Sequence, residues 1–247
     1  MENMEKIEFE NRVSGLTNEG YHFDFNKYVK HGFNLFKSNL LALVAFTSLQ
    51  ILLVSVATYY LVKDGLNVED IANLSKSELS PDDVKVIKVV FKYLILQLLI
   101  TSPFSAGIYY GIRLADKGKS FISYVDFFQG MKKYGLQMLL LNILYYLVVM
   151  LGAILIFPGI YFGVAFMIAP AILVSGNASV LRSLEVSRKL ITKHWFSFLG
   201  IMLIYFFLTL ILSTSLPLLL VFLSPFFMSV VYAIYSDLFW EEPEVIE

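Results

Sequence analysis

The chain of 247 residues contains no cysteine, so it can form no disulfide, no thiolate metal site and no cysteine nucleophile. Charge is also scarce, because only 16% of the residues are charged and the formal net charge is −1. This balance predicts no polyanionic partner, and the sequence has no basic stripe of the kind that follows a nucleic-acid backbone. We therefore expect no nucleic-acid binding.

Groups for catalysis or metal binding are few as well. The three histidines, His22, His31 and His194, are well separated, and no carboxylate spacing joins them into a metal site. The stretch "ADKGKS" at residues 115–120 lacks the first glycine and the preceding strand of a phosphate-binding loop. No grouping of serine, histidine and aspartate suggests nucleophilic catalysis. We expect a protein without enzymatic activity and without a cofactor.

Apolar residues are abundant: they make up 57% of the chain, and the mean hydropathy is +0.70. This is the composition of an integral membrane protein rather than of a water-soluble domain. Residues 1–20 are acidic and lack an apolar core, so they do not resemble a signal peptide. We expect residues 1–23 to be disordered or loosely attached, residues 24–240 to form one membrane domain, and residues 241–247 to be an acidic tail.

Uncharged runs indicate the membrane spans, since a bilayer core about 30 Å thick needs roughly 20 apolar helical residues per crossing. Residues 39–62 and 93–112 each suffice for one span, and the second helix is expected to begin near Ser80, a possible cap, and Pro81. The longer runs 134–181 and 195–236 divide at "FPG" (157–159) and "STSLP" (213–217). We therefore predict an all-α, polytopic bundle of six transmembrane helices.

The basic residues that flank the spans predict the orientation. Most of them fall on one side, whereas the other side has two turns without a basic residue and the acidic loop 63–85. Lys88 and Lys92 also fall on that other side and weaken the bias. We expect a multi-pass protein of the bacterial inner membrane with both termini in the cytoplasm.

Three amphipathic segments of similar design, residues 25–37, 121–133 and 180–196, each precede an odd-numbered span. Asn177 is expected to cap the third. Helices with basic polar faces lie at the headgroup boundary of a membrane, so we predict three interfacial helices that contact lipids, anionic ones included. The basic residues predicted to contact headgroups are Lys27, Lys30, Lys37, Lys132, Lys133, Arg182, Arg188, Lys189 and Lys193.

The even-numbered spans also resemble one another. "SPFSAGIYYGI" and "SPFFMSVVYAI" align without a gap, which superimposes Pro103 on Pro225, and Pro170 has the same relative place in span four. We predict a threefold repeat with units at about 24–115, 120–175 and 177–238. Kinks at the three prolines would either frame a central cavity or bow the helices to pack around aromatic side chains. Gln50, Gln97 and Asn142 are the buried polar candidates, most simply as interhelical hydrogen-bond partners.

Residues 157–200 resemble the membrane domain at the N-terminus of some bacterial glycerophosphoryl diester phosphodiesterases and related stand-alone inner-membrane proteins of unknown function. The matching positions are Pro158, Gly159, Tyr161, Pro170, Gly176, Ser187, Lys193 and Trp195. The sequence contains no soluble catalytic domain, so the resemblance implies no phosphodiesterase activity here. The acidic residue often found at the glycine turn is also absent, because Ser175 and Asn177 flank Gly176.

Two functions are compatible with these features. The first is a non-enzymatic membrane protein that binds lipids or acts as a scaffold through its basic amphipathic helices. The alternative is a transporter or channel-like protein for an uncharged, zwitterionic or lipid-like solute, with a cavity lined by the proline-kinked helices. The spans carry no ionisable residue, so the sequence offers no obvious carrier of protons or ions.

Overall fold

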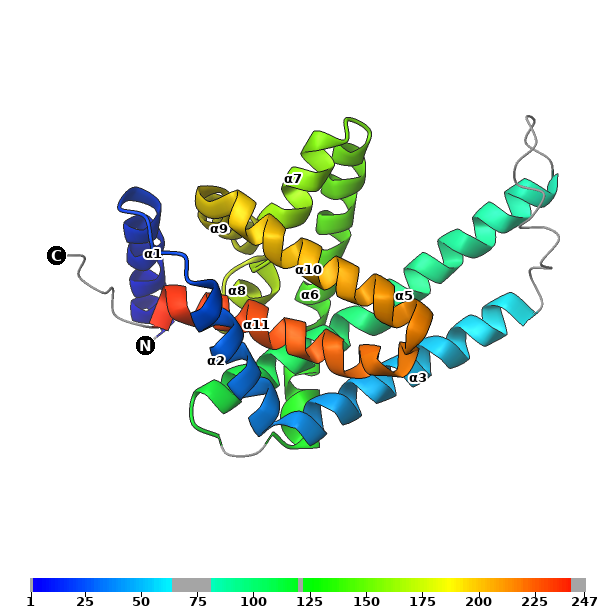
Figure 1. Ribbon diagram of the computed structural model, residues 1–247, viewed down its shortest axis with the longest axis horizontal. Coiled ribbons are helices and arrows are strands. Elements are labelled where there is room, and N and C mark those ends of the chain that lie inside the picture. The colour runs from blue at the N-terminus through cyan, green and yellow to red at the C-terminus, as the bar shows by residue number, and fades with distance from the viewer. Residues whose placement is uncertain (1, 64–80, 120–121, 241–247) are drawn as a thin grey trace.

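The computed structural model describes residues 2–63, 81–119 and 122–240, and these residues contain helices and no strand (Figure 1). Six segments are long and apolar enough to cross a membrane, and each overlaps one of the six predicted spans, although several begin earlier than predicted. The prediction of an all-α membrane bundle is therefore confirmed. Ser80, the predicted cap of the second span, lies outside the described residues, but that helix does begin at Pro81.

The helices are α1 (Glu2–Asn18), α2 (Phe25–Ser38), α3 (Leu40–Lys63), α5 (Pro81–Asp116), α6 (Tyr124–Ala153), α7 (Phe157–Ala165), α8 (Ala169–Ser175), α9 (Val180–Ile191), α10 (Trp195–Ser215) and α11 (Leu220–Trp240), with single 3₁₀ turns at Thr192–His194 and Pro217–Leu219. Three hairpins result: α3 with α5, α6 with α7 and α8, and α10 with α11. In Figure 1 the α3–α5 hairpin extends to the right and the α6–α7 hairpin to the top, away from the left end where both chain termini lie.

The centre of the bundle is built by the even-numbered spans. Helices α5, α8 and α11 each contact the other two. Large apolar side chains fill the space between them, and Ile112, Ile172 and Tyr232 are at most 1% exposed. The space between α5, α8 and α11 is therefore filled by interdigitating side chains.

Each amphipathic segment packs on an even span of a different hairpin. Helix α2 approaches α11 so closely that a Cβ on Gly32 would lie 2.7 Å from Val230 Cα. The start of α6 approaches α5 in the same way, because a Cβ on Gly130 would lie 3.0 Å from Gly107 Cα. Helix α9 packs on α8. The contacts therefore form a closed cycle. The first hairpin packs against the amphipathic segment of the second unit, the second hairpin against that of the third, and the third hairpin against that of the first.

The described part of the N-terminal region is ordered, although disorder was one of the two states expected for residues 1–23. Residues 2–18 form α1, in which Val13 and Leu16 are 3% and 6% exposed, and α1 packs against α9 and α11. Phe9 stacks on Phe239, with 5.1 Å between ring centroids. These few apolar residues were not recognised in the acidic sequence of α1, because the surfaces that they contact exist only in the folded bundle.

The second amphipathic segment is not a separate helix. It continues without a break into the third span as α6, which begins with a capping box between Ser123 and Asp126. By contrast, Asn39 ends α2 before α3 begins, and the 3₁₀ turn at Thr192–His194 separates α9 from α10. No proline or turn interrupts the sequence between Lys133 and the apolar run, so the helix continues.

One further prediction about local structure is wrong. The third amphipathic helix is capped by Ser179, whose side chain accepts a hydrogen bond from the Arg182 amide, whereas Asn177 adopts a left-handed φ of 49°. Span four is interrupted at residues 166–168, and Pro170 follows this break in the first turn of α8, where proline is well tolerated. Pro103 and Pro225 do lie inside helices, as expected.

Candidate functional site: the charged end of the bundle

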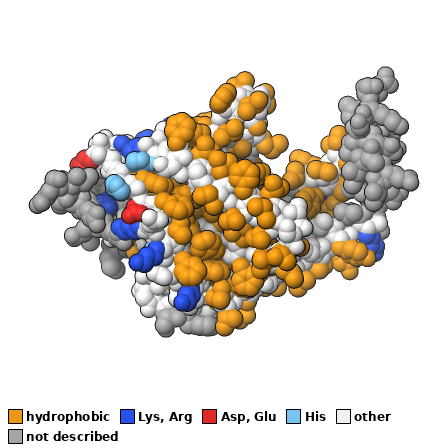
Figure 2. All heavy atoms as spheres, in the orientation of Figure 1, with side chains coloured by type: hydrophobic (Ala, Val, Ile, Leu, Met, Phe, Trp, Pro, Cys, Tyr) orange, Lys and Arg blue, Asp and Glu red, His pale blue; other side chains and the backbone are white. Residues whose placement is uncertain are grey.

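Charged side chains gather at one end of the molecule. On the face shown in Figure 2, most blue, red and pale blue side chains lie at the left, a further blue patch lies at the right end, and orange apolar side chains cover most of the remaining coloured surface. The left end in the same orientation carries α1, the start of α2 and the end of α11 (Figure 1). We therefore ask which of the predicted headgroup-binding residues are free to contact lipid and which are paired within the protein.

Three of those nine basic residues form ion pairs within the protein. Lys27 Nζ lies 2.6 Å from Asp237 Oδ1, and Lys189 Nζ lies 2.7 Å from Glu185 Oε1. Arg182 pairs with both Glu10 and Glu185. The Lys27 and Arg182 pairs join different helices, whereas the Lys189 pair lies within α9. All three side chains are therefore poorer candidates for headgroup contact than the sequence suggested.

Five other basic residues are exposed, and each has an exposed apolar residue three or four positions away along the chain. These five residues, called the surface lysines below, are Lys30, Lys37, Lys132, Lys133 and Lys193. Their apolar neighbours include Phe33 on α2, Phe128 on α6 and Phe196 on α10, which are 49%, 54% and 82% exposed. Arg188 is half-buried. An exposed cation beside an exposed aromatic ring suits the boundary between headgroups and acyl chains.

A polar junction that the sequence did not reveal joins α2, α5 and α11. Asp116, the last residue of α5, accepts hydrogen bonds from Tyr232 Oη (3.1 Å) and Ser236 Oγ (2.7 Å). Its other oxygen lies 3.1 Å from His31 Nε2, and the Asp116 side chain is only 12% exposed. The junction thus fixes one carboxylate with three partners at the charged end of the central helices.

The spacing of residues along α5 is the sequence feature that could have revealed this junction. Asp116 follows Ile108 and Ile112, both 1% exposed, at intervals of four residues, so it continues the buried stripe of α5. Arg113, one turn before Asp116, donates to the carbonyl of Val174 (3.0 Å) near the end of α8. From the sequence, Arg113 counted only among the basic residues that indicate orientation and Asp116 had no predicted role, although both side chains contact neighbouring helices.

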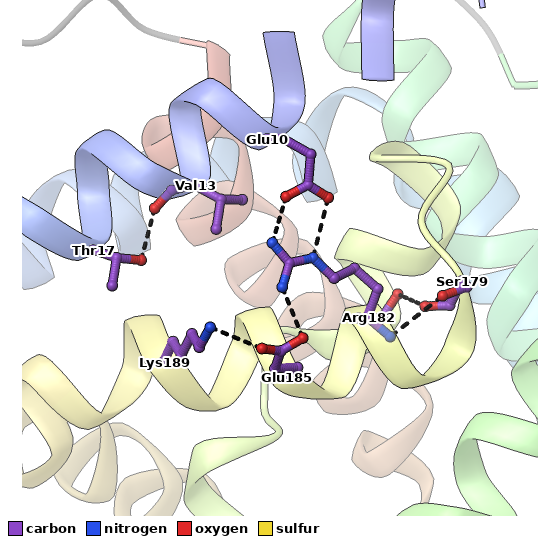
Figure 3. A network of polar contacts seen from close by, with 8 residues as sticks. Glu10, Val13, Thr17, Ser179, Arg182, Glu185 and Lys189 are labelled. Atoms are coloured by element: carbon purple, nitrogen blue, oxygen red, sulfur yellow. Dashed lines mark hydrogen bonds and ion pairs between the residues drawn. The ribbon is translucent and has the colours of Figure 1, made fainter. Parts of the chain in front are cut away.

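A second network ties α1 to α9 (Figure 3). Arg182 donates to both carboxylate oxygens of Glu10, through Nε (3.1 Å) and through Nη2. Its Nη1 donates to Glu185 Oε2 at 2.7 Å. The connection after α1 is also held, because Tyr21 donates its hydroxyl to the carbonyl of Leu190 (2.9 Å). Burial raises the pKa of Tyr21 well above its ordinary value, so this hydroxyl keeps its proton.

The polar side chains predicted in the spans have different environments. Asn142 Nδ2 donates to Ser102 Oγ (2.9 Å), which joins α6 to α5 as expected of an interhelical hydrogen bond. Gln50 and Gln97 are half-buried and make no side-chain hydrogen bond to another described residue. The structure does not bring these three residues together into one polar cluster.

The kink positions pack against neighbouring elements. Pro103 lies against α6, where a Cβ on Gly135 would lie 3.3 Å from the proline Cβ. Pro225 is buried. Of the three positions expected to line a cavity in the transporter alternative, Ser102 and Ala169 are fully buried and Ser224 is half-buried. A groove of about 140 Å³ lies elsewhere, between α2, α10 and α11, and is lined by apolar residues such as Val29, Ile204 and Phe226.

Comparison with known proteins adds no relative, since no family model, no curated protein and no solved structure matches this chain.

Proposed function

We propose that this chain is a non-enzymatic, multi-pass protein of the bacterial inner membrane that binds anionic lipids and acts as a scaffold at the cytoplasmic leaflet. The observation that carries the proposal is the set of five surface lysines beside exposed aromatic and aliphatic side chains at the charged end of the bundle. The proposal places both termini in the cytoplasm.

The physical basis is the attraction of lysine for an anionic surface, about 1 kcal/mol for each basic residue near such a membrane. The lysine stems lie along apolar surface while the ammonium groups reach the headgroups. The neighbouring side chains, Phe33, Phe128 and Phe196, would insert among the upper acyl chains. Five such sites in one chain favour enrichment of anionic lipid around it.

The cyclic packing of amphipathic segments on α5, α8 and α11 supports a threefold repeat with its axis along the membrane normal. Such a repeat would bring the three amphipathic segments to one leaflet, where their lysines could contact the same headgroup layer.

The test uses the full-length chain purified into nanodiscs of mixed zwitterionic and anionic phospholipid. We expect the fivefold variant with Lys30, Lys37, Lys132, Lys133 and Lys193 changed to Gln to lose most of the enrichment of anionic lipid measured by mass spectrometry. The matched control changes Lys63, Lys88 and Lys92, exposed lysines of α3 and α5 outside the surface-lysine set. Equal enrichment in the wild type and the fivefold variant would overturn the proposal.

A further inference from the structure

The Glu10–Arg182 contact carries an inference about a specific ligand. Arg182 lies in the first turn of α9, and its guanidinium holds a carboxylate through two nitrogen atoms (Figure 3). A planar guanidinium fork suits a phosphate as well as it suits a carboxylate. The first turn of a helix also favours a negative charge. The site therefore already binds an anion, and that anion belongs to the chain itself.

The helix that supplies this anion is attached by a small surface. Helix α1 contacts α9 and α11, and its apolar anchors are Phe9, Val13 and Leu16. The opposite face of α1 is exposed, as Ile7 at 61% shows. Elements with few buried contacts open at lower free energy than the core of a protein. Release of α1 would leave Arg182 with Glu185 as a remaining partner and would uncover the guanidinium fork.

We propose that Arg182 is a binding site for a phosphate group and that α1 covers it, with Glu10 as a built-in competitor. The chemistry of the ligand is a phosphate with at least one negative charge, carried by a lipid headgroup or by free phosphate. Binding of this ligand displaces Glu10 and with it α1. The inference rests on the proposed function in that it names one headgroup site, but it concerns the arginine and not the surface lysines.

Because the chain has no cysteine, two introduced cysteines can carry spin labels without background. Suitable positions are Ile7 on α1 and Phe196 on α10, which are 61% and 82% exposed. In nanodiscs of phosphatidylcholine we expect one narrow distribution of distances between the two labels. Addition of phosphatidic acid should lengthen and broaden that distribution as α1 leaves.

Three variants of the labelled protein test the role of each residue. E10Q should lower the half-saturating fraction of phosphatidic acid by about two- to fivefold, the effect of losing one exposed ion pair. E8Q is the matched control, because Glu8 is exposed on the same helix, and it should behave as the wild type. R182Q should no longer respond to phosphatidic acid, and its unfolding temperature shows whether it remains folded.

Inorganic phosphate added to phosphatidylcholine nanodiscs separates the two sources of ligand. A response to phosphatidic acid alone assigns the site to a lipid, and a response to both assigns it to phosphate in general. The proposal is overturned if neither ligand moves the labels, if folded R182Q responds as the wild type does, or if E8Q matches E10Q. Loss of lipid enrichment in the lysine variant with immobile labels would leave the proposed function standing and remove only this inference.

Discussion

Glycines set the distance between helices at the charged end. Gly32 has no room for a side chain, because its Cβ would lie 2.7 Å from the backbone of Val230, whereas Gly200 in α10 has no atom within 4 Å of that position. We predict that G32A destabilises the protein by about 1–3 kcal/mol, the usual cost of overpacking. The matched change G200A should stabilise it by about 0.5–1 kcal/mol, since alanine favours a helix more than glycine does.

Denaturant unfolding in detergent micelles measures both glycine variants. Equal changes in the free energy of unfolding would show that α2 and α11 do not pack as closely as described.

The carboxylate of Asp116 is the second residue on which the charged end depends. D116A would remove the carboxylate that contacts His31 and accepts hydrogen bonds from Tyr232 and Ser236. We expect it to cost about 1.5–3 kcal/mol, the range for hydrogen bonds to a charged group, because the His31 side chain is 38% exposed and solvent screens its ion pair. S236A removes one of three hydrogen bonds and should cost about 1 kcal/mol. Thermal unfolding in detergent measures both, and a larger loss in S236A than in D116A would contradict this account of the junction.

At the scale of residues, the sequence was informative where the environment of a residue is set by its position along its own helix. Pro103, Pro225 and Asn142 have the environments expected of them. It was misleading for Arg182, whose basic face suggested lipid contact. The reason is that Glu10, its partner, lies 172 residues away, and no local pattern connects the two positions.

At the scale of elements, the hydrophobic runs predicted the six spans and both breaks between paired spans, because span length is set by the thickness of the bilayer. The N-terminal helix and the continuity of α6 could not be predicted in the same way. Helix α1 is stabilised by a surface that exists only in the folded bundle, and Val13 and Leu16 alone give a weak pattern in an acidic segment.

The contact between α5 and α6 includes a hydrogen bond between Ser102 and Asn142, whose loss can be measured. In membrane proteins such bonds contribute about 0.6 kcal/mol on average and at most about 1.7 kcal/mol. We predict a coupling energy in this range from a double-mutant cycle of S102A and N142A. Unfolding in mixed micelles supplies the four free energies. The control cycle pairs Q97A with N142A, where no hydrogen bond joins the two side chains, and its coupling energy should be near zero.

At the scale of the whole molecule, the packing of α5, α8 and α11 opposes a water-filled centre at the charged end. Cysteines placed at Ser102 and Ala169, both 0% exposed, should be protected from a water-borne maleimide. A cysteine at the exposed Lys193 should react readily and serves as the control. Rapid reaction at Ser102 and Ala169 in the folded protein would favour the transporter alternative.

The presence of three helical hairpins was predictable from the sequence, but the order of the contacts between them was not. Helix α2 packs against the third hairpin because of close glycine contacts such as Gly32 with Val230, and these contacts join distant parts of the chain. Hydropathy gives the number and length of spans, and close packing decides their neighbours.

The most direct test of the account is the side of the membrane on which the three amphipathic segments lie. Single cysteines replacing Lys30, Lys133 and Lys193 report the three segments, and one replacing Lys63 reports the opposite end of α3. In vesicles of defined orientation we predict that an impermeant maleimide labels the first three only from the cytoplasmic side and the fourth only from the other side. Labelling of any of the first three from the side that labels Lys63 would contradict the account.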